Sequence, residues 1–416
     1  MRGMSPFAPG WLLAACCSLA VPDARAETAQ GPPSAPSNGD EVTALRHELE
    51  SLRQEYARRI AALEARLQAV AEAAAATSPP AVPAERAAPA PLPPSSSKAF
   101  NPDIAAIGNF VGAAGPTPGG GEPSLDMQEA ELSFQAVVDP YARADFFVTT
   151  GAEGVELEEG YITFPTLPGG LLAKVGKMRD VFGKVNAQHP HTLPYADRPL
   201  VTRNLTGGEE GLADSGISVA RLIPNPWLFL EATAQIYRGD SALFEAPTRG
   251  DLAYVGHLRA YRDLGESTNL DLGGSIAWGH NGATASSTTR LLGVDATLRW
   301  KPLRRSIYTS FLARGEYTWS RREEPEARFD ATGGYGYLEY QFARRFTAGL
   351  RYDNSARADA PGVRDEGGSF IATFKPSEWS LLRAQYRRTR KGSEEPENEL
   401  LFQLLFAIGA HAAHPF

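Results

Sequence analysis

The feature that most constrains this chain is an alternation of apolar and polar residues that recurs along most of its length. In "LLGVDATLRW", residues 291–300, apolar and polar side chains alternate at each step from Leu292 to Trp300. Successive side chains of a strand point to opposite faces, so a period of two predicts a strand with one apolar and one polar face. "EAELSFQAVV" (129–138) and "NLDLGGSIAW" (269–278) repeat the pattern. The chain from residue 100 onward is therefore predicted to be all-β.

The segments between the alternating stretches fall into two sets, because short turns such as Asp139-Pro140 alternate with longer polar connections. A soluble β-sandwich also alternates apolar and polar residues, but it has no reason to sort its connections by length. An outer-membrane barrel has short turns at one end and longer loops at the other. We predict about sixteen strands, at 101–111, 128–138, 141–149, 156–164, 171–179, 215–222, 227–237, 252–261, 268–279, 288–300, 306–319, 330–342, 345–354, 367–375, 379–388 and 398–408, with the longer loops at 112–127, 180–214, 238–251, 320–329, 355–366 and 389–397.

A barrel in a lipid bilayer gives each face of such strands its own solvent, with hydrocarbon outside and water inside. After residue 26 the sequence has no run of eighteen apolar residues, so insertion into a bilayer would use strands. Closing the sheet leaves no backbone edge unpaired in hydrocarbon. The predicted fold is therefore an antiparallel transmembrane β-barrel. Five aromatic residues near strand ends are expected to lie at the bilayer interfaces, with ordinary core aromatics as the alternative: Trp300, Tyr317, Trp319, Tyr340 and Trp379.

The first hundred residues differ from the rest. Residues 1–26 read as a cleaved secretory signal, with acylation of Cys16 as the alternative. Both cysteines, Cys16 and Cys17, lie in this leader, so the cleaved chain would have no thiol. Residues 27–40 are predicted to be disordered. Residues 41–76 carry an apolar stripe with one slip and predict a short α-helical coiled coil, with a surface amphipathic helix as the alternative. Residues 77–99 form a Pro/Ala-rich linker before the barrel of 100–416.

Two sets of residues carry a family resemblance. Gly176-Lys177-Met178 followed by Phe182-Gly183, and hairpins of the "YQF…LRYD" type, resemble the phosphate-selective porin O/P-like family over residues 100–416. The resemblance implies a trimeric barrel of sixteen strands in the bacterial outer membrane, preceded by a signal peptide and a periplasmic coiled coil that holds protomers together or reaches peptidoglycan. The terminal Phe416 is similar to the signal read by the barrel assembly machinery.

The predicted function is a channel for the passive diffusion of small hydrophilic solutes. The family resemblance implies that these solutes include anions such as phosphate. The alternatives are a structural outer-membrane anchor for the coiled coil and a barrel similar to TonB-dependent receptors. The sequence has no G-x-S-x-G motif, so we predict no enzyme, and no cofactor is implied. The net charge of −8 argues against a nucleic-acid partner.

The expected pore wall carries both signs of charge in nearly equal number. Rings of one sign select ions, whereas mixed charges pair across the wall, so the sequence leaves ion preference open. The basic residues Lys177, Arg179, Arg299, Arg314, Arg351 and Arg383 are predicted to attract anions. The predicted pore-lining set is completed by Arg259, Asp295 and Glu316.

The connection 180–214 is the longest of all. By likeness to general porins, whose third external loop folds inward, it is expected to form a constriction. Its histidines are expected to be solvated, because no carboxylate set or cysteine lies near them in the sequence, and no metal site is predicted. The constriction would be lined by Lys184, His189, His191, Arg198 and Arg203, facing Glu209 and Glu210.

Overall fold

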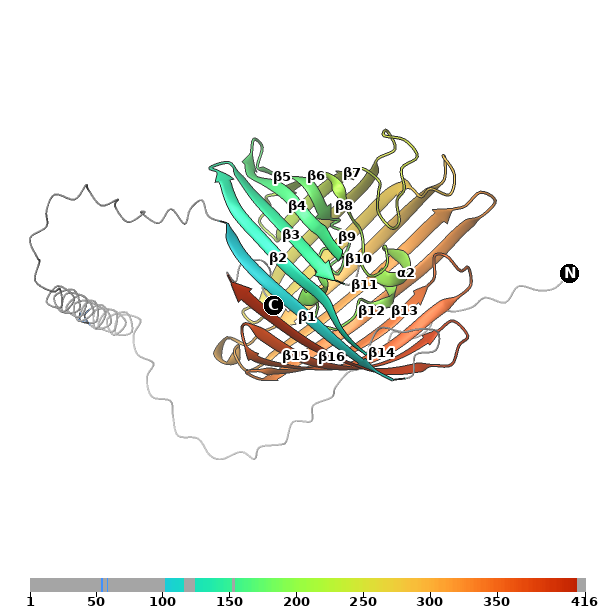
Figure 1. Ribbon diagram of the computed structural model, residues 1–416. Helices are drawn as coiled ribbons and strands as arrows, with labels where there is room; N and C mark the ends of the chain where they lie inside the picture. The colour runs from blue at the N-terminus through green and yellow to red at the C-terminus, as the bar shows by residue number, and fades with distance from the viewer. Residues whose placement is uncertain (1–53, 55–57, 59–101, 116–123, 152–153, 410–416) are drawn as a thin grey trace, which may run out of the picture. The chain divides into compact units, whose positions relative to one another are not determined.

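The protein is described by a computed structural model covering residues 102–115, 124–151 and 154–409, together with Gln54 and Arg58. The described part of 92–416 is a closed antiparallel barrel of sixteen strands (Figure 1), which confirms the predicted fold class. The strands are β1 (Asp103–Ala114), β2 (Leu125–Asp139), β3 (Ala142–Gly151), β4 (Gly154–Leu167), β5 (Leu171–Arg179), β6 (Ala213–Leu222), β7 (Phe229–Tyr237), β8 (Ala253–Gly265), β9 (Thr268–His280), β10 (Thr288–Trp300), β11 (Ser310–Glu323), β12 (Arg328–Ala343), β13 (Phe346–Ala356), β14 (Arg364–Ser377), β15 (Ser380–Lys391) and β16 (Glu397–Gly409).

Each strand pairs with its neighbours in sequence, and β1 closes the ring by pairing with both β2 and β16. The closing register places Ala105 opposite Gly409 and Ala114 opposite Leu400. Because the ring is closed, backbone hydrogen bonds are satisfied around the whole wall, as hydrocarbon requires. No helix among the described residues is long and apolar enough to span a bilayer.

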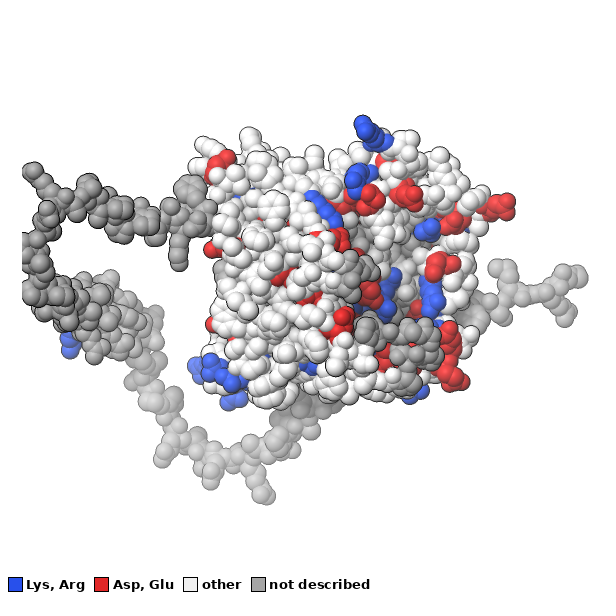
Figure 2. Space-filling model, in the orientation of Figure 1, with Lys and Arg blue, Asp and Glu red and all other residues white. Residues whose placement is uncertain are grey.

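The two faces of the strands differ as the alternation predicts. On β10, Leu292 and Val294 are 47% and 49% exposed on the outer face, while Asp295 and Thr297 are buried inside. Uncharged residues make up most of the wall in view in Figure 2. The aromatic residues predicted at the interfaces are all exposed, so the core alternative is wrong for them: Trp300, Tyr317, Trp319 and Tyr340 lie on the outer face, and Trp379 lies in the turn between β14 and β15.

Some strand ends differ from the prediction. β11 begins at Ser310, because the 3-10 turn Leu303–Arg305 is followed by turn residues at 306–308 in the first part of the predicted strand, and it continues to Glu323. The predicted loop 320–329 is therefore only 324–327. Arg321 binds Asp330 of β12 at 2.9 Å across the two strands. At these charged strand ends the backbone pairing continues into water. There the alternation of apolar and polar side chains no longer marks the end of the strand.

The chain also forms a first unit, Met1–Pro91, in which only Gln54 and Arg58 are described, and both are helical and exposed. The predicted leader, disordered segment and linker, and the coiled coil apart from these two residues, lie outside the described residues. Phe416 lies outside them as well, and the last strand ends at Gly409.

Candidate functional site: the lumenal loop

The connection between β5 and β6, residues 180–212 and here called the lumenal loop, lies inside the barrel. It contains a 3-10 turn η1 (Pro190–Thr192) and a short helix α2 (Leu200–Leu205), which Figure 1 places within the ring of strands. Its backbone amides donate hydrogen bonds to side chains around the inner wall. These run from Val181 to Gln235 of β7, from Gly183 to Ser275 of β9, from Val185 to Glu316 of β11, from Ala196 to Gln385 of β15 and from Leu200 to Asp353 of β13, at 2.7–3.1 Å.

The local sequence explains how the chain turns into the lumen. Gly183 has φ +66, a left-handed conformation that costs other residues about 1–2 kcal/mol, and a Cβ there would collide with the Glu316 carboxylate. Gly293 on β10 leaves room for the Phe182 ring, which a Cβ at that position would meet. Helix α2 ends before Gly207 and Gly208, both at positive φ, which suits the end of a helix.

Two apolar clusters hold the lumenal loop against the wall. The first packs Phe182 and Leu212 with Met178, Tyr237 and Leu291 of the wall, among others. The second packs loop residues Val185, Leu193, Tyr195, Val201 and Leu205 against Ala331, Tyr335, Tyr337 and Ile371. Burial of apolar surface stabilises at about 25 cal/mol per Å², so these clusters favour a loop packed in the lumen over one exposed to water.

Asp197 is the ionic centre of the lumenal loop. Its carboxylate accepts hydrogen bonds from Arg351 of β13 at 2.9 Å and from Arg387 of β15 at 2.6 Å. Arg351 also binds Asp353 at 2.7 Å, and Arg387 also pairs with Glu399 of β16. Although burial raises it, the two guanidinium groups hold the pKa of Asp197 well below its usual range. The charge of Asp197 thus ties the loop to β13 and β15, and through Arg387 to β16.

Other basic residues of the loop have separate partners. Lys184 binds Asp271 at 2.9 Å and lies 3.9 Å from Asp295. Arg198 donates to the carbonyls of Val185 and Gln188 at 3.2 and 3.0 Å, and burial, together with nearby Arg179, lowers its pKa to about 10. These contacts place both side chains within the loop–wall network.

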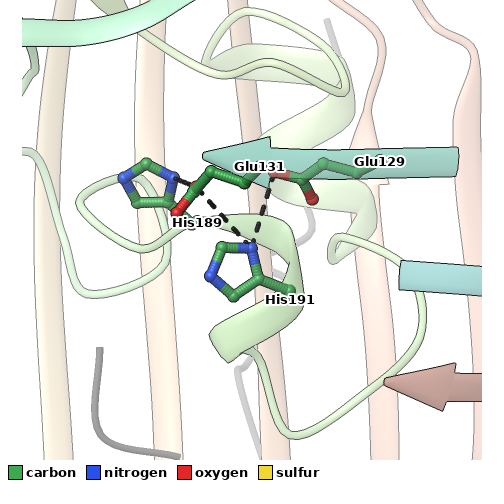
Figure 3. Close-up of side chains that lie close together, drawn as sticks. All are labelled: Glu129, Glu131, His189 and His191. Atoms are coloured by element: carbon green, nitrogen blue, oxygen red, sulfur yellow. Dashed lines mark ion pairs between the residues drawn. The ribbon is translucent and has the colours of Figure 1, made fainter. Parts of the chain in front are cut away.

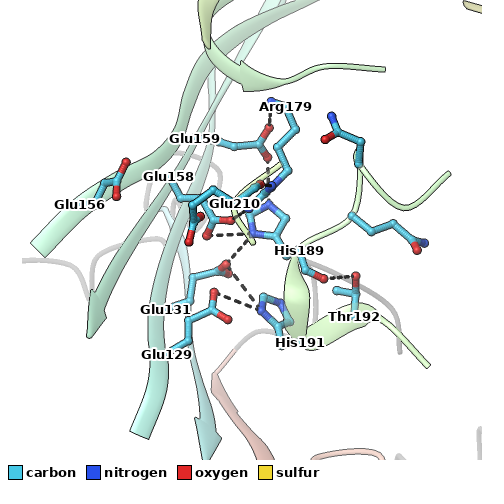
Figure 4. Close-up of polar contacts among 12 residues, drawn as sticks. Glu129, Glu131, Glu156, Glu158, Glu159, Arg179, His189, His191, Thr192 and Glu210 are labelled. Atoms are coloured by element: carbon cyan, nitrogen blue, oxygen red, sulfur yellow. Dashed lines mark hydrogen bonds and ion pairs between the residues drawn. The ribbon is translucent and has the colours of Figure 1, made fainter. Parts of the chain in front are cut away.

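Glu209 and Glu210 do not face all of the loop residues that were predicted to line the constriction. Arg203 binds Glu209 at 2.5 Å. The two histidines instead pair with glutamates of the wall, because the loop turns inward before η1 and brings them against β2 and β4 (Figure 4). The expected arrangement of His189 and His191 against Glu209 and Glu210 is therefore wrong.

His189 and His191 are both 2% exposed, so the expectation that they are solvated is also wrong. His189 Nδ1 lies 3.0 Å from Glu131 and 3.2 Å from Glu158, and its Nε2 lies 3.0 Å from Glu159. Although burial lowers it, these three carboxylates raise the pKa of His189 well above its ordinary value. The sequence misled us because the carboxylates come from strands 30 to 60 residues away.

The predicted pore-lining residues divide into three groups: arginines paired with a carboxylate of the wall, Lys177 with an exposed partner, and the remaining residues on the lumenal side. Arg179 pairs with Glu158, and Arg259 binds Asp271 at 2.7 Å. Lys177 binds Glu156, which is 67% exposed, and the Leu157 carbonyl. The structure brings the others to the lumenal side of the wall: Asp295, Arg299, Arg314, Glu316, Arg351 and Arg383.

Glu158, Glu159 and Asp197 are site residues that were not predicted from the sequence. Two consecutive acidic residues break the alternation of β4, and the register shifts there, between Phe147 and Val148 of the partner strand. A break of this kind is a readable signal of a bulge that re-aims a side chain. Asp197 has no such signal, because its role depends on arginines more than 150 residues away.

Two cavities border the lumenal loop. One of about 560 Å³ is lined by residues of α2 together with Asp365, Arg387 and Glu399. The other, of about 520 Å³, is lined by Glu129, Glu158, Pro190 and Asp197, and it also reaches Arg387. Arg387 and its partner Asp197 therefore lie where the two cavities approach each other.

Comparison with known proteins gives one relative and a set of structural neighbours. No family model matches the chain. An uncharacterized protein of Aquifex aeolicus (strain VF5) is 30% identical over 341 residues, which cover 70% of each chain.

The structural neighbours include three outer-membrane proteins. A loop L8 deletion mutant of Vibrio cholerae OmpT has a TM-score of 0.52 at 10% identity and covers 75% of this chain and 100% of its own. An anion-selective porin from Comamonas acidovorans has a TM-score of 0.51 at 10% identity, covering 74% and 99%. Pseudomonas putida OprB has a TM-score of 0.51 at 9% identity, covering 75% and 95%. The chain thus belongs to the family of the A. aeolicus protein, and its barrel has the fold of outer-membrane porins.

Proposed function

We propose that this protein is a porin-type channel of the bacterial outer membrane that lets small hydrophilic solutes diffuse passively, with the lumenal loop as its constriction. The observation that carries the proposal is the combination of an apolar outer face, a charged inner face and a loop anchored to the wall from inside. A closed wall separates lipid from the lumen, and the side chains at the narrowest point decide which solutes pass.

The proposed preference is for anions, with phosphate as one candidate. Most lumenal arginines are neutralised by carboxylates, as Arg351 is by Asp197 and Asp353. Arg314 instead donates to the neutral Gln188, and Arg383 donates to Thr373 and Gln403. Arg299 completes this group as an exposed arginine near Arg314. These three guanidinium groups leave positive charge that would attract anions into the lumen.

The test is the reversal potential of the full chain in planar bilayers under a salt gradient. Because Arg299 is exposed and no carboxylate lies within ion-pair distance of it among the described residues, R299E would reverse a charge without removing a buried ion pair. We expect the reversal potential of R299E to move toward that of a cation-selective pore. The matched control is R321E, because Arg321 is an exposed arginine paired with Asp330 at the loop end of β11, and its shift should be smaller. Pores with equal potentials for both variants and wild type would contradict anion attraction by Arg299.

The proposal extends to the setting of the barrel. We place it in outer-membrane lipid as a homotrimer, with residues 1–26 cleaved, 27–40 disordered and the coiled coil of 41–76 in the periplasm beyond the linker 77–99. Phe416 would be read by the barrel assembly machinery, and the coiled coil would contact peptidoglycan. Among the structural neighbours, V. cholerae OmpT is described in a trimer form, with a TM-score of 0.50 at 9% identity.

One observation favours a second candidate, a structural anchor that conducts little. The two apolar clusters pack the lumenal loop against wall strands on two sides, β5 and β7–β10 in one cluster and β12 and β14 in the other, so the loop takes up lumenal space. Removing the loop would give such an anchor a pore that the natural protein lacks. Wild-type protein that inserts into bilayers without conductance would therefore favour the anchor over the channel.

A further inference from the structure

We propose that Glu129, Glu131, His189 and His191, here called the His/Glu cluster, bind a divalent transition-metal ion that fastens the lumenal loop to the wall. Figure 3 shows the four side chains converging from β2 and from the segment that contains η1. One donor atom from each lies within 4.8 Å of all the others, and all four residues are buried.

The spacing of the donor atoms suits a metal ion. His189 Nδ1 is 3.0 Å from Glu131 Oε2, and His191 Nδ1 is 3.5 Å from Glu129 Oε1 and 3.9 Å from Glu131 Oε2. With metal–ligand bonds of 2.0–2.2 Å, the donors around a tetrahedral ion are about 3.3–3.6 Å apart. The three separations above lie within a few tenths of an ångström of this range, and the remaining donor pairs, all within 4.8 Å, would need to close by at most about 1.5 Å.

The surroundings of His189 match the usual support of a metal-bound imidazole. Its Nδ1 faces the cluster while its Nε2 lies 3.0 Å from Glu159 Oε2. The other oxygen of Glu159 accepts a hydrogen bond from the Arg179 backbone amide at 2.6 Å. A metal-ligating histidine almost always pairs its second nitrogen with a carboxylate, a backbone carbonyl or water, which fixes the ring orientation.

Charge favours a cation at the same place. The side chains of Glu129, Glu131, Glu158 and Glu159 are at most 10% exposed, and the Arg179 guanidinium pairs with Glu158. Buried carboxylates require pairing or coordination to a metal. Because the four carboxylates outnumber the one guanidinium, the charge of a divalent ion would be balanced here with both imidazoles neutral.

The donor set indicates the class of ion, and the neighbouring cavity gives it a route. Two imidazoles with two carboxylates suit Zn²⁺ and other first-row divalent ions better than Mg²⁺ or Ca²⁺, which take oxygen ligands. The cavity of about 520 Å³ is lined by Glu129, Glu158 and Pro190, so it reaches the cluster from the side of the lumenal loop. A bound ion would link η1 to β2 and hold the proposed constriction in place.

The experiment is a Zn²⁺ titration of the full chain, folded in detergent, stripped of metal and then competed against a chromogenic chelator. We expect one ion per chain bound at the cluster, and an affinity lower by more than about 10-fold in H191Q. H257Q is the matched control, because His257 is another buried lumenal histidine but binds Ser275 of β9. It should bind Zn²⁺ like the wild type.

A second measurement keeps the proposal testable if one variant folds poorly. Co²⁺ loaded into the wild type should give a visible d–d absorption band, which E131Q and H191Q should lose while a heat-modifiability gel shows them folded. Wild type that binds no Zn²⁺, or binds it equally well with H191Q, overturns the metal site. Conductance of the same samples separates the two proposals: pores without Zn²⁺ binding reject only the metal site, and Zn²⁺ binding without pores rejects only the channel.

Discussion

At the scale of single residues, Asp180 makes the lumenal loop sensitive to pH. Burial and the nearby Asp214 raise the pKa of Asp180 to about 8, against smaller opposing effects of Tyr237 and Arg179. A carboxyl group whose pKa is higher in the folded state binds more protons there than in the unfolded state. Stability therefore falls as pH rises from the unfolded pKa near 4 through 8, and then levels off.

The prediction concerns D180N, which cannot ionise. Between pH 5 and pH 9 the unfolding midpoint of the wild type in detergent should fall more than that of D180N, because only the wild type must bury a charge near Asp214. Heat-modifiability gels at matched detergent concentration measure both midpoints. Identical pH slopes for the two proteins would show that Asp180 does not titrate in this range.

Residue roles were the least predictable part of the sequence. The alternation placed Asp295 and Arg299 on the inner face of β10, and Asp295 is indeed buried there. The partners were not predictable, because Lys184 reaches Asp271 and Asp295 only after the loop has turned inward. Side-chain pairing across a lumen depends on three-dimensional placement that a period of two does not encode.

At the scale of elements, the strands could be predicted from the sequence, whereas the structure of the lumenal loop could not. The predicted bounds of 171–179 and 288–300 match β5 and β10, because hydrophobic periodicity is strong where lipid covers one face. The lumenal loop has no such periodicity. Its anchoring depends on polar pairs and glycines, so only its length indicated a special role.

Asp197 tests how the loop is anchored. Replacing it in D197N leaves Arg351 and Arg387 with less compensating charge, and breaking a buried ion pair in this way typically costs about 3–5 kcal/mol. We expect a lower unfolding midpoint and noisier single-channel current. The control D330N removes an exposed acid paired with Arg321 and should leave both properties almost unchanged. Equal midpoints for D197N and D330N would show that the Asp197 pairs contribute nothing to holding the loop.

At the scale of the whole molecule, barrel closure connects sequence pattern to function. Pairing of β1 with β16 makes one continuous wall, so the outer apolar face and the inner charged face become two separated surfaces. The strand number was readable from the sequence because closure gives every strand one apolar and one polar face, whereas the sorting of loop lengths is less strict than expected, since 324–327 is short and 301–309 is long. Which solutes cross depends on the space left beside the lumenal loop.

The most direct test of this account compares single-channel conductance of the wild type with that of a chain in which residues 185–210 are replaced by a short Gly/Ser linker. Both proteins should fold as barrels in detergent, because the described wall pairs strand to strand around the ring. The account predicts a small conductance for the wild type and a several-fold larger one for the shortened chain. Equal conductance and ion preference in the two folded proteins would contradict it.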